Sequence, residues 1–363
     1  MLKITTYTIS ALALTACAME PMDEDESTTA QSIMDPVIDD ETGCPRWGCG
    51  ENSPVMGPYS FWEGNLLGVP DPTTHITFLD FRMAAAPNIA YAPTLVNGSQ
   101  LVATRKTWPY TQLQGAALEG GYFRIGTPSG EFKIFISKVN VKATSNVKFW
   151  VGNPDRIETY ELNYTGPGIT QDQLCDNPPG RDAGEAPGHI YTAPLEAVLF
   201  TGDRYDAERK RVTATTYAAT NGWMTIACAG SALAKLHFNR HTTAGSDSTH
   251  QTTLLERQTL MKMYVSDVCG DGNAWTVKGT KLHWQNTYQW VKLDHMEWGF
   301  ESRWGPYGAI CMDTHRLGDT YVNPPPGMPK ISDYCAVPAC NGSVVTPTYG
   351  GGYIVSAVPF NPF

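Results

Sequence analysis

The sequence has no apolar stretch of membrane-spanning length after residue 17. A transmembrane helix needs about 20 consecutive apolar residues, so we expect the body of the protein to be soluble. It also has no basic patch, and no basic stripe interleaved with aromatic residues, which argues against nucleic acid as a partner. Finally, it has no internal repeat of fixed period, which argues against a solenoid or propeller.

Positive charge and aromatic residues are both missing between residues 20 and 41, where nine residues are acidic. A segment of this composition cannot bury enough apolar surface to fold, so we predict a disordered tether over residues 17–42. The chain has 26 basic and 36 acidic residues, a net charge of −10. Without Lys3 and the nine acids, 25 basic and 27 acidic residues remain, a net charge of −2. The acidity of the whole chain therefore does not indicate a cationic partner.

The segment before this tether has the pattern of an export signal. Lys3 is followed by a mostly apolar run over residues 4–16, which is as long as a signal-peptide core and too short to span a bilayer. The sequence Leu-Thr-Ala-Cys at residues 14–17 resembles a bacterial lipobox. That resemblance implies a signal peptide over residues 1–16, acylation of Cys17, and membrane lipid as a partner through the acyl chains. An ordinary secretory signal and a buried N-terminal helix are the alternatives.

The resemblance also predicts a location in the cell envelope. Ala18 follows the lipid site, where an Asp would resemble an inner-membrane retention signal. We therefore expect the outer membrane rather than the inner one, with the body exposed to the periplasm or the cell surface.

Eight cysteines remain after Cys17, and an even number in an exported chain predicts disulfides. Two pairs have a four-residue gap containing turn-forming residues, which favours Cys44–Cys49 and Cys335–Cys340 as local bridges. We then pair the other four as Cys175–Cys228 and Cys269–Cys311, although eight cysteines allow 105 connectivities. Zinc is the alternative, but no C-x2-C spacing or paired histidine accompanies these cysteines, so we expect no metal.

The first half of the body predicts a β-rich domain over residues 43–165, either a meander or a sandwich. Residues 132–141 alternate apolar and polar side chains with period two, which is a strong strand signal. Further strands are predicted at residues 59–62, 75–81, 122–125, 147–151 and 157–162. Residues 166–194 are rich in Gly, Pro, Asp and Asn and predict a linker or long loop.

The second half predicts a disulfide-bonded α+β domain over residues 195–318 and a Pro/Gly-rich extension over residues 319–363. Its expected elements are a buried strand at 223–227, a helix at 228–238, a second helix from 254 to 268, a hairpin over 275–284, and strands at 296–301 and 309–315. On the second helix we expect one apolar face formed by Leu254, Leu255, Met261, Tyr264, Val265 and Val268. Glycine in residues 269–272 is expected to end this helix in a left-handed cap.

Three blocks of this half resemble the ADYC domain family in order and content. They are residues 226–235, residues 263–272 followed by 276–280, and residues 304–311. The family is found in exported proteins of certain Gram-negative bacteria and is named for the sequence Ala-Asp-Tyr-Cys. Here the motif is Ser266-Asp267-Val268-Cys269, with two departures, and the closer literal match at residues 332–335 lacks the Gly-Asp-Gly that follows the motif. The resemblance covers about residues 195–316, and the family has no established activity.

Cys228 is a candidate nucleophile because it is the first residue of a predicted helix, whose dipole would lower the pKa of a free thiol. A cysteine hydrolase would add a histidine base and a carboxylate that orients it. The candidates for these roles are His237, His283, His295, Asp267 and Asp294. The even cysteine count favours a half-cystine instead, so the sequence does not identify catalytic residues.

Three other patterns are weaker. His237 and His241 have the i, i+4 spacing of a zinc pair but lack the glutamate of H-E-x-x-H. Two oxygen-rich groups could hold calcium but do not match a twelve-residue loop: Asp203 with Asp206 and Glu208, and Asp267 with Asp271 and Asn273. For Asp267 we favour a structural carboxylate that accepts backbone N–H groups. Trp and Tyr could line a glycan groove, although aromatic residues in strands are mostly core.

The sequence thus predicts an α+β lipoprotein without a cofactor. It favours a structural or binding role over an enzymatic one, with a protein or a glycan as the unidentified partner. The alternatives are a cysteine-dependent hydrolase and a glycan-binding module.

Overall fold

A computed structural model describes residues 54–143, 156–175, 196–206, 210–228, 231–245, 252–276, 282–285, 298–314, 316, 331–340 and 354–359. The predicted signal peptide, Cys17, the tether, Cys44 and Cys49 lie outside these residues, as does the strand predicted at 147–151. No helix in the described part of the chain has both the length and the apolar character that crossing a bilayer requires.

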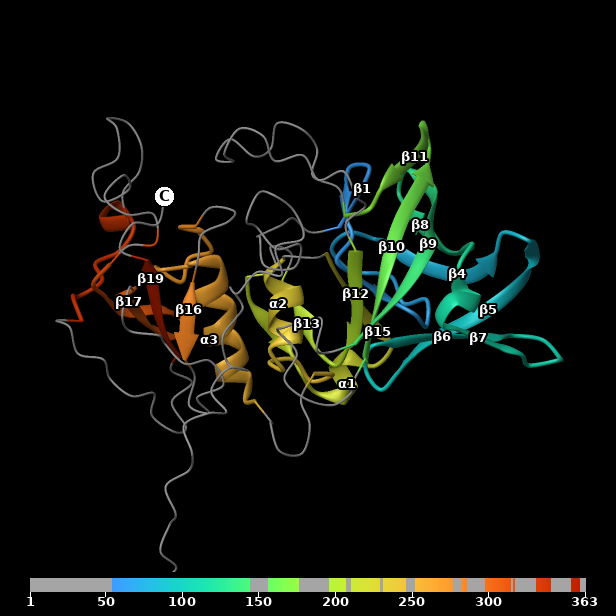
Figure 1. The fold of residues 1–363 in the computed structure, drawn as a ribbon. Helices are drawn as coiled ribbons and strands as arrows, with labels where there is room; N and C mark the ends of the chain where they lie inside the picture. Colours follow the sequence, from blue (N-terminus) through green and yellow to red (C-terminus); the bar gives the residue numbers. More distant parts are fainter. Residues whose placement is uncertain are drawn as a thin grey trace, which may run out of the picture.

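An eleven-stranded antiparallel sheet dominates the described structure (Figure 1). Its order is β3-β15-β12-β10-β9-β8-β4-β5-β6-β7, with β11 paired to β10. The strands are β3 (Glu63–Asn65), β4 (Thr77–Met83), β5 (Ala86–Val96), β6 (Gln100–Arg105), β7 (Gln112–Gln114), β8 (Gly121–Thr127), β9 (Gly130–Ala143), β10 (Arg156–Gly166), β11 (Ile169–Gln173), β12 (Glu196–Thr201) and β15 (Trp223–Cys228).

The period-two pattern of residues 132–141 is realised in β9. Phe132, Ile134 and Ile136 are buried, while the side chains between them are less so. This alternation places one face of the strand in the core, as the pleat of a strand requires. The predicted strand is therefore confirmed as part of β9.

The sheet curls, so that β6 approaches β10 and β12. The Tyr160 hydroxyl on β10 accepts the backbone N–H of Leu101 on β6 at 3.0 Å, and the backbone N–H of Thr201 donates to the Gly98 carbonyl at 3.0 Å. Strand β12 is consequently covered on both faces. Its Leu199 lies in the core inside the curl, and Phe200 lies in a second core under the helices.

Two helices separate this sheet from a second one. Helix α2 (Ala232–Phe238) packs on β12 and β15, and helix α3 (Leu254–Val265) packs on α2 and on the second sheet (Figure 1). Ser231 caps α2 by accepting the backbone N–H of Ala234. Thr253 and Glu256 form a reciprocal capping box at the start of α3. A single turn, α1 (Tyr217–Thr220), precedes β15.

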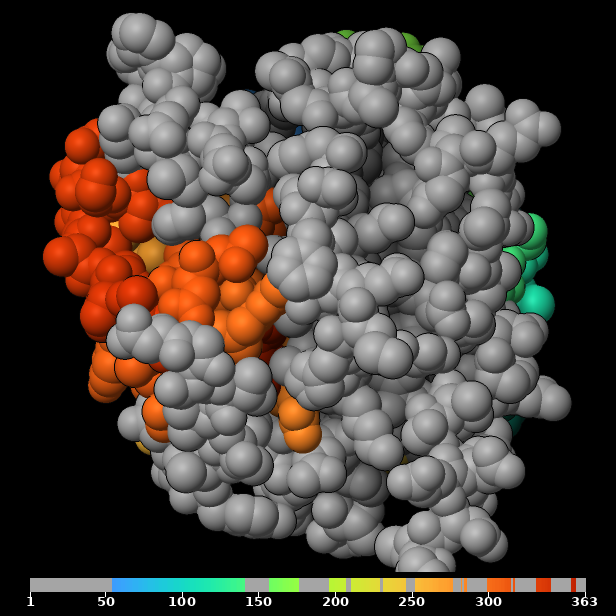
Figure 2. All heavy atoms as spheres, turned by 60° about the vertical axis from the view of Figure 1, so that its left-hand side comes forward, coloured from blue at the N-terminus to red at the C-terminus, as the bar shows by residue number. Residues whose placement is uncertain are grey.

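The second sheet has four antiparallel strands in the order β16-β19-β17-β18. They are β16 (His283–Gln285), β17 (Trp298–Gly305), β18 (Gly308–Met312) and β19 (Ile354–Pro359). Two further two-stranded sheets pair β1 (Val55–Met56) with β2 (Tyr59–Ser60), and β13 (Arg204–Tyr205) with β14 (Val212–Ala214). Short 3-10 helices are η2 (Gly115–Leu118) and η4 (Ile331–Asp333). In space-filling view, the described orange and red residues toward the C-terminus gather on one side, and green to teal parts of the large sheet show at the opposite edge (Figure 2).

The α+β fold class with a β-rich first half is confirmed, and so are the two longer helices. The position of the α3 terminus was wrong. The helix ends at Val265, and Ser266 adopts the left-handed cap with φ of 51° instead of a glycine in 269–272. The predicted turn of the 275–284 hairpin lies outside the described residues. Because the large sheet takes strands from both sides of residues 166–194, the structure assigns no boundary there, and the division into domains stays a prediction.

Candidate functional site

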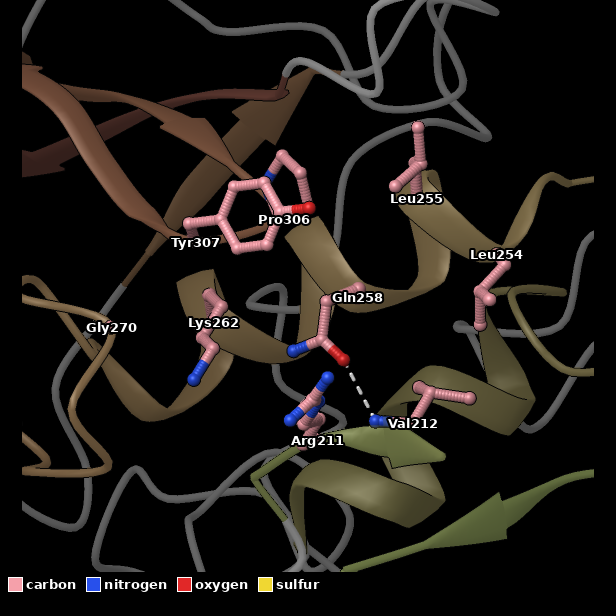
Figure 3. Close-up of a pocket in the computed structure, with 9 residues that line it drawn as sticks. All are labelled: Arg211, Val212, Leu254, Leu255, Gln258, Lys262, Gly270, Pro306 and Tyr307. Carbon is pink, nitrogen blue, oxygen red and sulfur yellow. Dashed lines mark hydrogen bonds between the residues drawn. The ribbon is translucent and has the colours of Figure 1, made fainter. Parts of the chain in front are cut away.

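A cleft of about 280 Å³ opens beside the turn that follows α3 (Figure 3). It lies between three elements: α3, the segment leading into β14, and the connection from β17 to β18. Its lining combines apolar, aromatic and cationic side chains. The lining residues are Arg211, Val212, Leu254, Leu255, Gln258, Lys262, Gly270, Pro306 and Tyr307.

Helix α3 supplies the floor of the cleft. Leu254, Gln258 and Lys262 are spaced four residues apart, so they share one face of the helix. Leu254 and Leu255 are 43% and 45% exposed, although the sequence pattern placed them on the buried face. Gln258 and Lys262 are buried instead. The expected apolar face was wrong at Leu254 and Leu255, whereas Met261, Tyr264 and Val268 are buried as expected. Polar residues are buried as well, because α3 is covered by α2 on one side and by the second sheet on another.

The polar groups of the floor are bonded within the protein. The Gln258 side chain accepts the backbone N–H of Val212 at 2.8 Å and donates to the Lys210 carbonyl at 3.2 Å. The Lys262 ammonium donates to the Asp267 carboxylate, and both side chains are buried. A buried ion pair of this kind is costly to break, because it would leave one charge without compensation. The floor therefore offers a ligand few unused hydrogen-bonding groups.

The Ser266-Asp267-Val268-Cys269 motif forms the turn at one end of the cleft. Asp267 accepts the backbone N–H of Gly272 at 3.1 Å, which confirms its predicted role as a structural carboxylate. The Val268 carbonyl accepts the backbone N–H of Ala309 at 2.9 Å. Two of the blocks recognised in the sequence, 263–272 and 304–311, thus bind each other through their backbones.

The rim of the cleft is more exposed than its floor. The Tyr307 side chain is 83% exposed at the tip of the β17–β18 connection, and Arg211 is exposed on the opposite side. In Figure 3 the Tyr307 ring, the Pro306 ring and the Gln258 side chain lie around the same opening. Sequence reasoning noticed Pro306 and Tyr307 only as part of a block. Nothing in the sequence brings Arg211 to α3, since these positions are far apart along the chain.

Three disulfides are present among the described residues. Cys175–Cys228 is confirmed, with sulfur atoms 2.04 Å apart. The predicted pairs Cys269–Cys311 and Cys335–Cys340 were wrong, because Cys269 binds Cys335 and Cys311 binds Cys340. The predicted pair Cys44–Cys49 lies outside the described residues. Short sequence gaps favoured local bridges, but the fold places residues 331–340 beside both the α3 turn and β18, where the Met312 N–H donates to the Pro338 carbonyl. These disulfides indicate a body that folds outside the cytoplasm.

The cysteine-hydrolase hypothesis based on Cys228 is wrong, because the sulfur of Cys228 is bonded to Cys175 and cannot act as a thiolate. Cys269 is likewise half of a disulfide. Asp267, offered as the orienting carboxylate, pairs with Lys262. His295 and Asp294 lie outside the described residues, as does the side chain of His283.

His237 lies in α2 and His241 follows its C-terminal end, and both are fully buried. His237 stacks on Phe200 with ring centroids 4.4 Å apart and bonds to Thr242 at 2.9 Å. Burial lowers the pKa of each histidine to about 3, so both are neutral in the folded protein. Within the described ranges, no group of three or more His, Cys, Asp or Glu side chains is arranged to hold a metal ion.

The first oxygen-rich group is part of the structural core rather than a cation site. The Asp203 carboxylate accepts the Arg257 guanidinium at 2.9 Å and the Thr243 hydroxyl at 3.0 Å, linking α3 to the end of β12. Burial raises the pKa of the Asp203 carboxyl, while Arg257 and Thr243 oppose that shift. Asp206 instead accepts backbone N–H groups from residues 210 and 211, and Glu208 lies outside the described residues.

The second oxygen-rich group is divided by the structure. Asp267 is committed to Lys262 and to the backbone N–H of Gly272. Asp271 bonds to Asn273 at the exposed surface. The two carboxylates therefore serve separate local contacts.

The family model of the ADYC domain matches residues 111–318, which is 208 of the 363 residues. The match begins well before residue 195, where the sequence resemblance started, so it takes in strands β7 to β12 as well as the helices and β18. Comparison with curated proteins and with solved structures finds no match.

Proposed function

The chain belongs to the ADYC domain family, and from that premise we propose that it is an exported binding protein whose cleft beside α3 takes a segment of another protein. The observation that carries this proposal is the combination of exposed apolar side chains at the cleft with buried polar side chains whose hydrogen bonds are already satisfied within the protein. Leu254, Leu255 and Tyr307 expose apolar surface around one opening. Burying that surface against a partner would be favourable.

The size of the cleft fits one bulky side chain. Its volume of about 280 Å³ is at the lower limit of the roughly 300–1,000 Å³ pockets that enclose a whole small molecule. Arg211 is the exposed cation of the lining, because Lys262 is neutralised by Asp267. A partner segment with an apolar side chain next to a carboxylate would pack the apolar group against the leucines and Tyr307. Its carboxylate would accept charged hydrogen bonds from Arg211.

A glycan is the second candidate, because the exposed Tyr307 ring could stack on a sugar. Sugar hydroxyls, however, need several free donors and acceptors. Gln258 already uses both its amide oxygen and its amide nitrogen on backbone groups. We therefore favour a peptide segment over a glycan.

For the location, the proposal keeps the lipobox expectation: Cys17 is acylated and holds the body at the envelope, with the outer membrane preferred. Support comes from the disulfides, which fit an oxidising compartment, and from the Leu-Thr-Ala-Cys sequence at residues 14–17.

A displayed library of seven-residue peptides tests this function. The full chain should enrich peptides with a large apolar residue beside Asp or Glu, and Tyr307→Ala and Arg211→Gln should each remove that enrichment. Tyr217→Ala is a matched control, because Tyr217 is 79% exposed on α1 and does not line the cleft. Enrichment that survives both cleft substitutions would contradict the proposal. A glycan-array signal lost in Tyr307→Ala would favour the second candidate.

A further inference from the structure

The hairpin of β6 and β7 carries a highly exposed tryptophan at its tip. Trp108 is 81% exposed and Tyr110 is 68% exposed. The residues around them, Lys106, Thr107 and Pro109, are exposed as well. Large aromatic side chains are normally buried, so two of them at the end of a hairpin need a physical explanation.

The tip is held firmly by backbone hydrogen bonds. The N–H of Arg105 donates to the Thr111 carbonyl at 2.9 Å and closes the hairpin. The N–H of Lys106 donates to the Ala90 carbonyl at 3.0 Å and ties the base of the tip to β5. The aromatic side chains are therefore presented by an ordered support, which reduces the entropy lost when they bind a partner.

This edge of the sheet has an unusual charge for an acidic protein. Residues 84–118, which include β5, β6 and β7, contain no Asp or Glu, and their charged residues are Arg105 and Lys106. The rest of the chain must therefore carry all 36 acids. The chain outside Lys3 and the acidic segment is nearly neutral, and a tip whose charged residues are both basic fits an anionic surface.

We propose that the β6–β7 tip docks on an anionic lipid bilayer, with Trp108 and Tyr110 at the level of the headgroups and Lys106 against lipid phosphates. Trp and Tyr prefer this interface because their rings are apolar while the indole N–H and the phenol hydroxyl stay hydrated. The hairpin projects at the end of the molecule opposite the four-stranded sheet (Figure 1), so it can reach a flat surface. A convex tip suits a bilayer better than a glycan, which is usually held in a groove.

The inference goes beyond the proposed function and is independent of the cleft. It is also compatible with a lipid anchor. The 37 peptide bonds between Cys17 and Pro54 span at most about 120–130 Å when extended, so an acylated Cys17 would leave the tip free to reach the same bilayer. Docking at the tip would then fix the orientation of the body, with the cleft and the four-stranded sheet directed away from the lipid.

Contact quenching by lipids with brominated acyl chains tests the proposal on the full chain. The vesicles contain phosphatidylethanolamine and phosphatidylglycerol. Bromine should quench the fluorescence of the unmodified chain, and Trp108→Phe should remove most of that quenching. The other described tryptophans whose exposure is known are buried: Trp62, Trp223, Trp275, Trp284 and Trp304.

Lys106→Gln tests the charge contribution. On the anionic vesicles it should weaken the Trp108-dependent association about fivefold, since a cation near such a surface contributes about 1 kcal/mol. On phosphatidylcholine vesicles it should change nothing. Tyr217→Ala is the control for loss of an exposed aromatic side chain elsewhere. Quenching that is the same with and without Trp108 overturns the proposal and leaves the tip to a protein or glycan partner. Tyr307→Ala should change peptide binding at the cleft but not this quenching, so the two proposals can fail separately.

Discussion

A β-carbon on Gly270 would lie 1.8 Å from the carbonyl oxygen of Tyr307. The turn after α3 and the β17–β18 connection therefore touch through their backbones, and only glycine permits this approach. Gly308 is equally restricted on the other side, where a β-carbon would lie 2.5 Å from the Val268 carbonyl oxygen. This contact joins two of the family blocks and holds Tyr307 at the rim of the cleft.

Gly270→Ala should lower the free energy of unfolding by more than about 3 kcal/mol. The substitution combines a positive φ of 71° with a backbone overlap, and the left-handed conformation alone costs about 1–2 kcal/mol. Gly168→Ala is the matched control, since its φ is 75° and a β-carbon there meets nothing within 4 Å. Urea unfolding with the disulfides intact measures both. Equal losses in the two variants would show that the close contact with Tyr307 has no energetic effect.

Peptide mapping under non-reducing conditions should recover Cys269 linked to Cys335 and Cys311 linked to Cys340. Replacing both Cys311 and Cys340 by Ala should lower the free energy of unfolding by about 2–4 kcal/mol, because the unfolded chain loses a constraint. Recovery of a peptide that links Cys269 to Cys311 would restore the pairing expected from sequence spacing.

Lys262→Met and Asp267→Asn should each lower the free energy of unfolding by about 3–5 kcal/mol. The first leaves the buried Asp267 carboxylate without its cation, and the second leaves the buried Lys262 ammonium without its anion. The double variant should lose less than the sum of the two. A parallel cycle on Lys138 and Glu161 should show a coupling of about 0–1 kcal/mol, because Lys138 is 58% exposed and the pair is 3.9 Å apart. Additive effects at Lys262 and Asp267 would argue against the ion pair.

Stability should fall as pH drops below about 6.5. Burial holds the pKa of His237 and His241 at about 3, whereas in the unfolded chain each titrates near its ordinary value of about 6.5. Between these values the unfolded chain binds protons that the folded chain does not. Each histidine then costs up to about 1.4 kcal/mol per pH unit, and this contribution ends near pH 3.

Urea unfolding over pH 4–7 measures this slope. His237→Gln and His241→Gln should each reduce it, because each removes one buried neutral imidazole. A slope that is unaffected by either substitution at the buried histidines would mean that other groups carry the acid sensitivity.

Cys17→Ser should move the protein from the membrane to a soluble or precursor fraction, because it removes the predicted acylation site. Cell fractionation and labelling with a radioactive fatty acid measure this change, and the unmodified chain should enter outer-membrane fractions. Unchanged labelling in the variant would exclude Cys17 as the lipid site, and recovery only in inner-membrane fractions would contradict the preference based on Ala18.

Local patterns in the sequence were enough for several elements. The alternation over residues 132–141 predicted part of β9, because one face of that strand is buried and the other is not. The helical propensity of residues 228–238 predicted α2, although the helix begins at Ala232 because Cys228 still belongs to β15. On α3 the apolar pattern predicted only some of the side chains that are buried. The helix is surrounded on several sides, so Gln258 and Lys262 are buried while Leu254 and Leu255 are partly exposed.

The sequence alone established the fold class, the family blocks and the disulfide-forming character of the chain. These depend on composition, periodicity and short motifs, which are local. Only the tertiary structure decided that Cys335 and Cys340 reach Cys269 and Cys311, that Arg211 and Tyr307 share a cleft with α3, and that Trp108 stays exposed at a hairpin tip. Each of these depends on which distant segments meet, and that is set by the packing of the whole chain rather than by the residues nearby.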